Sequence, residues 1–177
     1  MGAVSGHDLA EVMRAVKSGA RINEKDSTGQ TPLIAALRLP AYRHDQFLVV
    51  DYLLSQGADP NLIGESGFKD LEGIPIHIVV MMNSHSMNKP HRDSNNVAVE
   101  VMRRLLKSGA KVSSMDSRGR TPLHRAAESN NVVAAKILLE AGCRIMPKDL
   151  LGKTPLDYAE SSEMISLLKK HGAKELN

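Results

Sequence analysis

Residues 116–145 read DSRGRTPLHRAAESNNVVAAKILLEAGCRI, and they carry the strongest fold signal in this sequence. The following stretch, DLLGKTPLDYAESSEMISLLKKHGAKEL at residues 149–176, repeats the Asp, Gly and Thr-Pro-Leu positions at an interval of 33 residues. Self-similarity at a fixed period of this size is the sequence signature of a repeat architecture. We therefore expect an array of stacked units, because no single unit of this length can bury its own apolar face.

Each part of the unit has a local physical reason. Thr121 stands where its hydroxyl can cap free N–H groups at a helix start, and Pro122 suits the first helical position because it has no N–H to satisfy. Ala126 and Ala127 are small, so the short inner helix that contains them can stack closely. Gly142 suits the left-handed position that ends the outer helix. The apolar stripe of that outer helix is expected at Val133, Ile137 and Leu138.

Further copies lie upstream. DSTGQTPLIAALRL begins at Asp26 and continues to LVVDYLLSQGADPN at 48–61. A less regular copy comprises GIPIHIVV at 73–80 and VAVEVMRRLLKSGAKV at 97–112. Half of a copy, LAEVMRAVKSGARIN, lies near the start of the sequence. The sequence resembles the ankyrin repeat family, whose units carry D-x-x-G-x-T-P-L-H-x-A-A and close on L-L-x-x-G-A. The resemblance covers nearly the whole chain and implies an all-α solenoid of stacked helix-turn-helix units with finger loops.

The resemblance implies a single domain over residues 1–177, with an N-terminal half-cap and four further repeats. The Gly-Ala steps recur at intervals of 38, 52, 33 and 30 residues, so two units contain insertions between their helices. The expected units are a capping half-repeat at 7–25, a repeat at 26–61 with insertion 40–44, an irregular repeat at 62–115 with insertion 83–96, a regular repeat at 116–148 and a C-terminal capping repeat at 149–174.

Two histidines occupy the signature position that follows Thr-Pro-Leu or its equivalent. His124 lies in the regular repeat and His77 in the irregular one, whereas Ile34 and Asp157 replace the histidine in the other two units. In the ankyrin family this histidine ties neighbouring loops together by hydrogen bonds. The resemblance therefore implies a structural role for His77 and His124 rather than a catalytic one.

The insertion at 83–96, NSHSMNKPHRDSNN, is polar and contains His85 and His91. Together with His77, these residues suggest a metal-dependent enzyme as one alternative. Zinc sites use tighter ligand spacings and usually include cysteine or carboxylate, so we expect no metal, no cofactor and no catalytic residue. The favoured interpretation is that the insertion is a loop that the fold merely tolerates, since loop-closure entropy rises slowly with length. The alternative interpretation is that the insertion forms a contact surface. The outer helix after the insertion is expected to be capped by Ser94, Asn95 or Asn96.

Ankyrin arrays usually bind partners at their loop tips and on the exposed side of the inner helices. Several large apolar side chains occupy these positions here, and such a group on one face suggests a binding patch. The candidate partner-binding residues are Arg38, Leu39, Met81, Met82, Arg118, Arg120, Glu128, Lys148, Leu150, Leu151 and Lys153.

The charge distribution indicates what kind of partner these candidates would bind. Residues 107–153 contain nine Lys or Arg and four acidic residues, whereas residues 1–106 have a net charge of −1. A basic edge formed by Arg118, Arg120, Lys148 and Lys153 suits a partner protein with an acidic surface. A solvated face with no partner is the alternative. Nucleic acid is a weaker match because no aromatic stacking platform lies near these residues.

The sequence thus predicts a non-catalytic protein-binding module, monomeric on its own. It would act as an adaptor or scaffold, or as an effector delivered into a host cell. A dedicated inhibitor, such as an immunity protein that occludes a toxin, is the alternative. The single cysteine, Cys143, excludes an internal disulfide, and the sequence has no apolar run long enough for a membrane span. We therefore expect a cytoplasmic location.

Overall fold

The structure is a computed structural model that describes residues 9–38, 44–65, 73–82 and 92–174. All the regular secondary structure in these ranges is helical, so the all-α prediction is confirmed. The only β-type pairing among the described residues is an isolated antiparallel bridge between Gly64 and Gly73. The α-helices are α1 (Leu9–Lys17), α2 (Pro32–Leu37), α3 (His44–Ser55), α4 (Pro75–Met82), α5 (Arg92–Lys107), α6 (Pro122–Glu128), α7 (Val132–Glu140) and α8 (Ser162–Lys170), and a 3-10 helix, η2 (Pro155–Tyr158), precedes α8.

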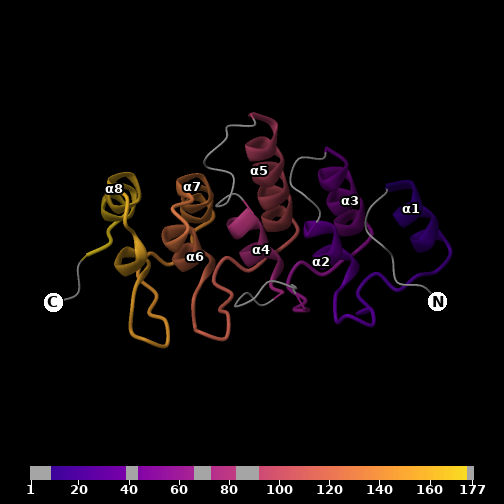
Figure 1. Cartoon of the computed structure of the whole chain (residues 1–177), viewed down its shortest axis with the longest axis horizontal. Coiled ribbons are helices and arrows are strands. Elements are labelled where there is room, and N and C mark those ends of the chain that lie inside the picture. Colours follow the sequence, from indigo (N-terminus) through magenta and orange to yellow (C-terminus); the bar gives the residue numbers. More distant parts are fainter. Residues whose placement is uncertain (1–8, 39–43, 66–72, 83–91, 175–177) are drawn as a thin grey trace.

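The helices form a single row of pairs, with α1 and α8 at opposite ends (Figure 1). The inner element of each pair is short (α2, α4, α6 and η2), and the outer helices lie along the other side of the row. Within a pair, α2 packs on α3, α4 on α5 and α6 on α7, and successive inner elements also pack on one another. The loops that connect one pair to the next project beyond the inner elements (Figure 1). This arrangement is the predicted solenoid.

One continuous apolar core runs the length of the row. Val12 on α1 is fully buried at one end, and Met164 and Leu168 on α8 are fully buried at the other. Ala36 on α2 and Ala126 on α6 are also fully buried, where their small side chains let adjacent repeats approach closely. The aliphatic residues of each pair are therefore covered by the neighbouring pairs, as a repeat array requires.

The starts of the inner helices are capped as predicted. Thr31 Oγ1 accepts a hydrogen bond from the backbone N–H of Ile34 at 3.3 Å. Thr121 forms a capping box with His124, whose Nδ1 accepts from the backbone N–H of Thr121 at 3.0 Å. Pro122 occupies the first helical turn. The Thr-Pro step therefore satisfies the first free N–H groups of these helices.

Two local predictions are wrong. Ser94, Asn95 and Asn96 do not cap the outer helix, because α5 already begins at Arg92 and runs for 16 residues, against nine for α7. The last part of the 83–96 insertion is therefore helical. Val133 does not belong to the buried stripe of α7, since it is 49% exposed, and Val132 is buried instead. The stripe begins one residue earlier because Asn131 caps the helix through the backbone N–H of Ala134.

Two asparagines bridge successive repeats in the same way. Asn23 Nδ2 donates to the carbonyl of Gly57 at 3.2 Å, and its Oδ1 accepts from the N–H of Asp59 at 2.8 Å. Asn61 makes the equivalent pair of bonds one junction later, to the carbonyl of Gly109 at 3.0 Å and the N–H of Lys111 at 2.8 Å. Each asparagine stands four residues after the glycine that ends an outer helix. These bridging asparagines hold adjacent repeats in register through the segments that follow their outer helices.

We expect the substitution Asn61→Ala to lower the free energy of unfolding by about 1–2 kcal/mol, because it removes two hydrogen bonds between repeats. Urea denaturation followed by circular dichroism measures the change. Gln56→Ala is the matched control: Gln56 is exposed and its amide only donates to the neighbouring Ser55 hydroxyl at 3.4 Å. Equal stability of the two variants would contradict the bridging role of Asn61.

Candidate partner-binding surface

Three finger loops, at residues 26–30, 116–120 and 149–153, share one internal geometry. Each begins with an aspartate whose Oδ1 accepts hydrogen bonds from the backbone N–H groups two and four residues later. The N···O distances are 2.8 and 3.0 Å at Asp26, 2.9 and 2.9 Å at Asp116, and 2.9 and 2.9 Å at Asp149. The fingers are therefore held in shape by their own first residue.

The loops at 116–120 and 149–153 are hereafter called the third and fourth fingers, because they begin the third and fourth repeats after the half-cap. These two fingers are also joined to each other. The backbone N–H of Leu150 donates to the carbonyl of Arg118 at 3.0 Å. Gly119 lies between them with φ of +73°, and a Cβ at this position would come within 3.1 Å of the Leu150 nitrogen. A side chain at position 119 would thus strain the backbone and force the fingers apart.

The two signature histidines connect inner helices to the next finger, as the family resemblance implied. His124 Nε2 donates to the carbonyl of Lys153 at 3.1 Å, and His77 Nε2 donates to the carbonyl of Ser114 at 3.0 Å. The proton of His124 resides on Nε2 because Nδ1 accepts from Thr121. Burial lowers the pKa of His124, so the neutral ring is the form that serves this link.

A network of buried charges links the last two repeats. Arg125 is buried on α6 and donates through Nε and Nη2 to Asp116 Oδ2, at 3.0 and 2.6 Å. Its Nη1 reaches Glu128 Oε2 at 3.2 Å, and Glu128 Oε1 accepts from Arg120 Nη1 at 2.7 Å. Arg120 Nε lies 3.8 Å from Asp149 Oδ2 in the next finger. Three carboxylates therefore surround two guanidinium groups.

Tyr158 on η2 completes this network. Its hydroxyl donates to Asp149 Oδ2 at 2.5 Å, and the Arg120 guanidinium lies 4.6 Å from the centre of its ring. Burial raises the pKa of Asp149, but the hydrogen bond from Tyr158 and the backbone N–H groups outweigh burial and leave that pKa below its ordinary value. The fourth finger is thus fixed both from within and from its neighbours.

The pKa of Asp116 follows the same balance. Burial raises it, but the backbone N–H of Arg120 and the charge of Arg125 outweigh burial, so the pKa lies below the ordinary 3.8. Burial lowers the pKa of Arg120, whereas the hydrogen bond and charge of Glu128 raise it, and the net shift is upward. These groups therefore all remain ionised at neutral pH.

The structure places most of the predicted contact residues on the surface. Arg118, Leu150, Leu151 and Lys153 lie exposed on the third and fourth fingers. Arg38, Glu128 and Lys148 are exposed elsewhere, and Met81 on α4 is half-buried. Leu39 lies outside the described residues, as does the side chain of Met82. The fold does not test whether these residues bind a partner, so their binding role stays a prediction.

Arg120 is the exception, because its expected exposure is wrong. Its side chain is buried between Glu128, Asp149 and Tyr158, so its charge is balanced inside the protein and does not extend the basic edge. The partner network around Arg125 was not anticipated either. An arginine inside the otherwise small and apolar run that follows His124 is the sequence signal that could have revealed it.

Comparison with protein families agrees with this geometry. A model of three ankyrin repeat copies matches residues 91–177, and an ankyrin repeat model matches residues 28–65. The chain belongs to the ankyrin repeat family. Ankyrin repeats generally serve as protein–protein interaction modules and are generally non-catalytic. No curated protein matches the chain.

Two further findings bear on the alternatives considered for this ankyrin array. Among the described residues no cluster of three His, Cys, Asp or Glu side chains could hold a metal ion, while His85 and His91 lie outside those residues. His77, the third histidine of the metal hypothesis, is buried and uses Nε2 for the Ser114 carbonyl. Over the same described part of the chain, no helix has the length and apolar character to cross a membrane.

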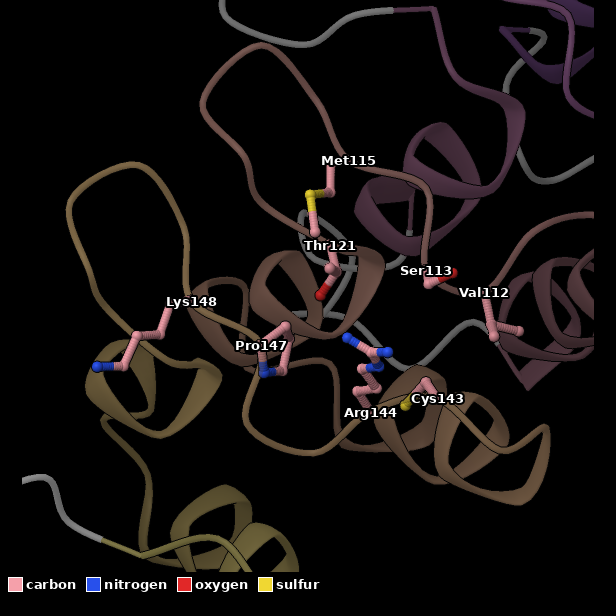
Figure 2. Close-up of a pocket in the computed structure, with 8 residues that line it drawn as sticks. All are labelled: Val112, Ser113, Met115, Thr121, Cys143, Arg144, Pro147 and Lys148. Carbon is pink, nitrogen blue, oxygen red and sulfur yellow. The ribbon is translucent and has the colours of Figure 1, made fainter.

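A second surface feature lies between the ankyrin repeats at 62–115 and 116–148, where the sequence predicted no site. It is a groove of about 490 Å³, hereafter the junction groove. Figure 2 shows its lining side chains, which come from the segments after α5 and α7 and from the start of α6. They are Val112, Ser113, Met115, Thr121, Cys143, Arg144, Pro147 and Lys148. Lys148, predicted as part of the finger surface, lines this groove.

The thiol of Cys143 offers a test of the burial of this region. Burial raises its pKa from 9.0 to about 11, so the thiolate is about 100-fold scarcer at pH 8 than in the unfolded chain. We expect iodoacetamide to alkylate native Cys143 about 100-fold more slowly than the chain in guanidinium chloride, as measured by mass spectrometry. Equal rates would show that the thiol is neither buried nor suppressed in its ionisation.

The buried network predicts the effect of Arg125→Met at neutral pH. The variant leaves the Asp116 carboxylate buried without its cation, so we expect a loss of about 3 kcal/mol in the free energy of unfolding. Lys111→Met, on an exposed side chain of the same repeat junction, is the control and should change stability by less than about 0.5 kcal/mol. Chemical denaturation at pH 7 measures both.

The same variant has a defined pH dependence. In the wild type the depressed pKa of Asp116 stabilises the fold above about pH 4, and this contribution disappears as the pH falls through the folded-state pKa. Arg125→Met removes most of that shift. The stability difference between wild type and variant should therefore shrink at pH 3, and a difference that stayed constant from pH 7 to pH 3 would contradict the ion pair.

Proposed function

We propose that this ankyrin array binds a partner protein, without catalysis, through the tips of its third and fourth fingers and the exposed residues beside them. The observation that carries the proposal is a pair of leucines at a finger tip. Leu150 is 76% exposed and Leu151 is 73% exposed. Water disfavours such a pair, and burial of either side chain in an interface would contribute about 1.5–3 kcal/mol.

The backbone around these leucines supports a binding role because it is already ordered. The N–H of Leu151 donates to Asp149 Oδ1 at 2.9 Å, and the N–H of Leu150 donates to the Arg118 carbonyl. A loop held by such bonds loses little conformational entropy when a partner docks. The leucine pair can therefore act as an anchor, and most of its burial would appear as affinity.

Charge around the anchor favours an acidic partner. Arg118 and Lys153 are exposed on the two fingers that carry or flank the leucines. Arg120 adds no free charge here because Glu128 and Asp149 balance it. The basic edge is thus narrower than the sequence suggested, and it steers an acidic surface toward the leucine pair rather than along the whole array.

We further propose that the array acts as an adaptor or scaffold inside the cell, monomeric on its own. An intracellular, cytoplasmic setting is supported by the single cysteine, Cys143, which is a free thiol. The same surface would also serve an effector delivered into a host cell. An inhibitor would differ in one measurable respect, because the captured partner would lose its own activity on binding.

The double substitution Leu150→Ser with Leu151→Ser tests the proposal. Both side chains are exposed, so the fold should be unchanged while affinity for the partner falls at least 100-fold. The wild type and the variant are used to capture proteins from a lysate, which are quantified by mass spectrometry and retested as purified pairs. Val133→Ser is the matched control, since Val133 is also exposed and apolar but lies on α7. A purified partner that bound the double variant as tightly as the control would overturn this surface as the binding site.

A further inference from the structure

The junction groove has a specific structural origin. At the two preceding junctions an asparagine, Asn23 or Asn61, stands at the corresponding position and bonds to one carbonyl and one N–H of the next repeat. The residue in the same register at the third junction is Ser113, four residues after Gly109. Its side chain is too short to make the pair of bonds. The groove thus coincides with the junction at which the bridging asparagine is missing.

The missing bridge leaves a defined pair of backbone groups. By register, the carbonyl of Gly142 and the N–H of Arg144 correspond to the groups that Asn61 satisfies at Gly109 and Lys111. Neither the Gly142 carbonyl nor the Arg144 N–H has a hydrogen-bond partner among the described residues. A donor and an acceptor thus lie side by side, which is the pattern that an amide group complements.

The groove is also positively charged. The Arg144 side chain points toward Thr121 in the middle of the lining residues, and Lys148 lies at the edge with its side chain directed away from the other lining residues (Figure 2). Both are exposed, and within the described part of the chain neither forms an ion pair. The apolar side chains of Val112 and Pro147 form part of the wall. A ligand must therefore combine carboxylates with an amide and some apolar contact.

We propose that the junction groove binds an extended acidic segment of a partner protein, whose amide group bridges the Gly142 carbonyl and the Arg144 N–H while its carboxylates pair with Arg144 and Lys148. This site rests on the proposed protein-binding function and adds to it a second contact made by other residues than the leucine pair. A phosphate or nucleic-acid backbone fits less well because its oxygens only accept hydrogen bonds and offer no donor to the Gly142 carbonyl.

The probe for this site is a fluorescein-labelled, C-terminally amidated peptide of sequence Glu-Asp-Asn-Asp-Glu. Its binding to the full chain is followed by fluorescence polarisation and by amide shifts in NMR spectra. We expect the largest shifts at residues 112–115 and 142–148. Replacing the central asparagine of the peptide by alanine should weaken binding at least fivefold, and a peptide with serines in place of its acids should not bind measurably.

The substitution Ser113→Asn is the decisive variant. Its side chain should make the bonds that Asn61 makes, so it should raise Tm by about 2–4 °C and weaken peptide binding at least tenfold. Because the variant is more stable, a loss of binding cannot come from misfolding. The double variant Arg144→Glu with Lys148→Glu should also weaken binding at least tenfold, while Leu150→Ser with Leu151→Ser should leave it unchanged.

Each contrary result has a clear meaning. Unchanged peptide affinity in Ser113→Asn, or shifts centred on the fingers, would overturn the groove as an acidic-segment site. Equal affinity for inorganic phosphate or a single-stranded oligonucleotide, insensitive to Ser113→Asn, would also overturn it. If a purified partner required the leucine pair but ignored every groove variant, the groove would fail and the proposed function would stand. Loss of the partner in the groove variants alone would support the groove and overturn the leucine anchor.

Discussion

Each helix pair in this protein has an apolar face that its own residues cannot cover, and every other feature depends on this constraint. The faces are buried only when the pairs stack, so the core runs unbroken from Val12 to Leu168. Stacking at a constant distance requires small side chains at the contact, which Ala36 and Ala126 supply. It also tolerates insertions that leave the stacked faces intact, since such residues can extend outward without entering the core.

Stacking by apolar contact alone does not fix the register of one repeat on the next, because the hydrophobic effect is non-directional. Hydrogen bonds and ion pairs between the repeats fix this register. Asn61 bridges the repeats at 26–61 and 62–115, His77 links an inner helix to the following finger, and Arg120 lies 3.8 Å from Asp149 in the next repeat. A repeat junction therefore needs both kinds of contact, and a junction that lacks one polar link is altered locally without loss of the stack. Ser113 marks such a junction.

The sequence predicted those features that depend on neighbours within one unit. The cap at Thr121 and the loop link of His124 involve short spacings or the family signature, and both are confirmed. Arg120 was misplaced because its environment comes from Asp149 and Tyr158, which the chain brings close only through stacking. The start of α5 was misplaced because a polar run such as DSNN is compatible with a cap or with helix, and propensity alone does not decide between them.

Rigidity and exposure coincide at the fourth finger, and that combination is unusual for a loop. Exposed loops are ordinarily mobile, so an exposed apolar residue on one pays an ordering cost when it is buried by a partner. Here Asp149 holds the finger from within, while Tyr158 and the third finger hold it from outside. The network therefore holds the fourth finger in shape while leaving its two leucines exposed. Arg120, which the sequence placed on a binding edge, instead helps to keep Leu150 and Leu151 in position, while Arg118 and Lys153 lie exposed on the two fingers.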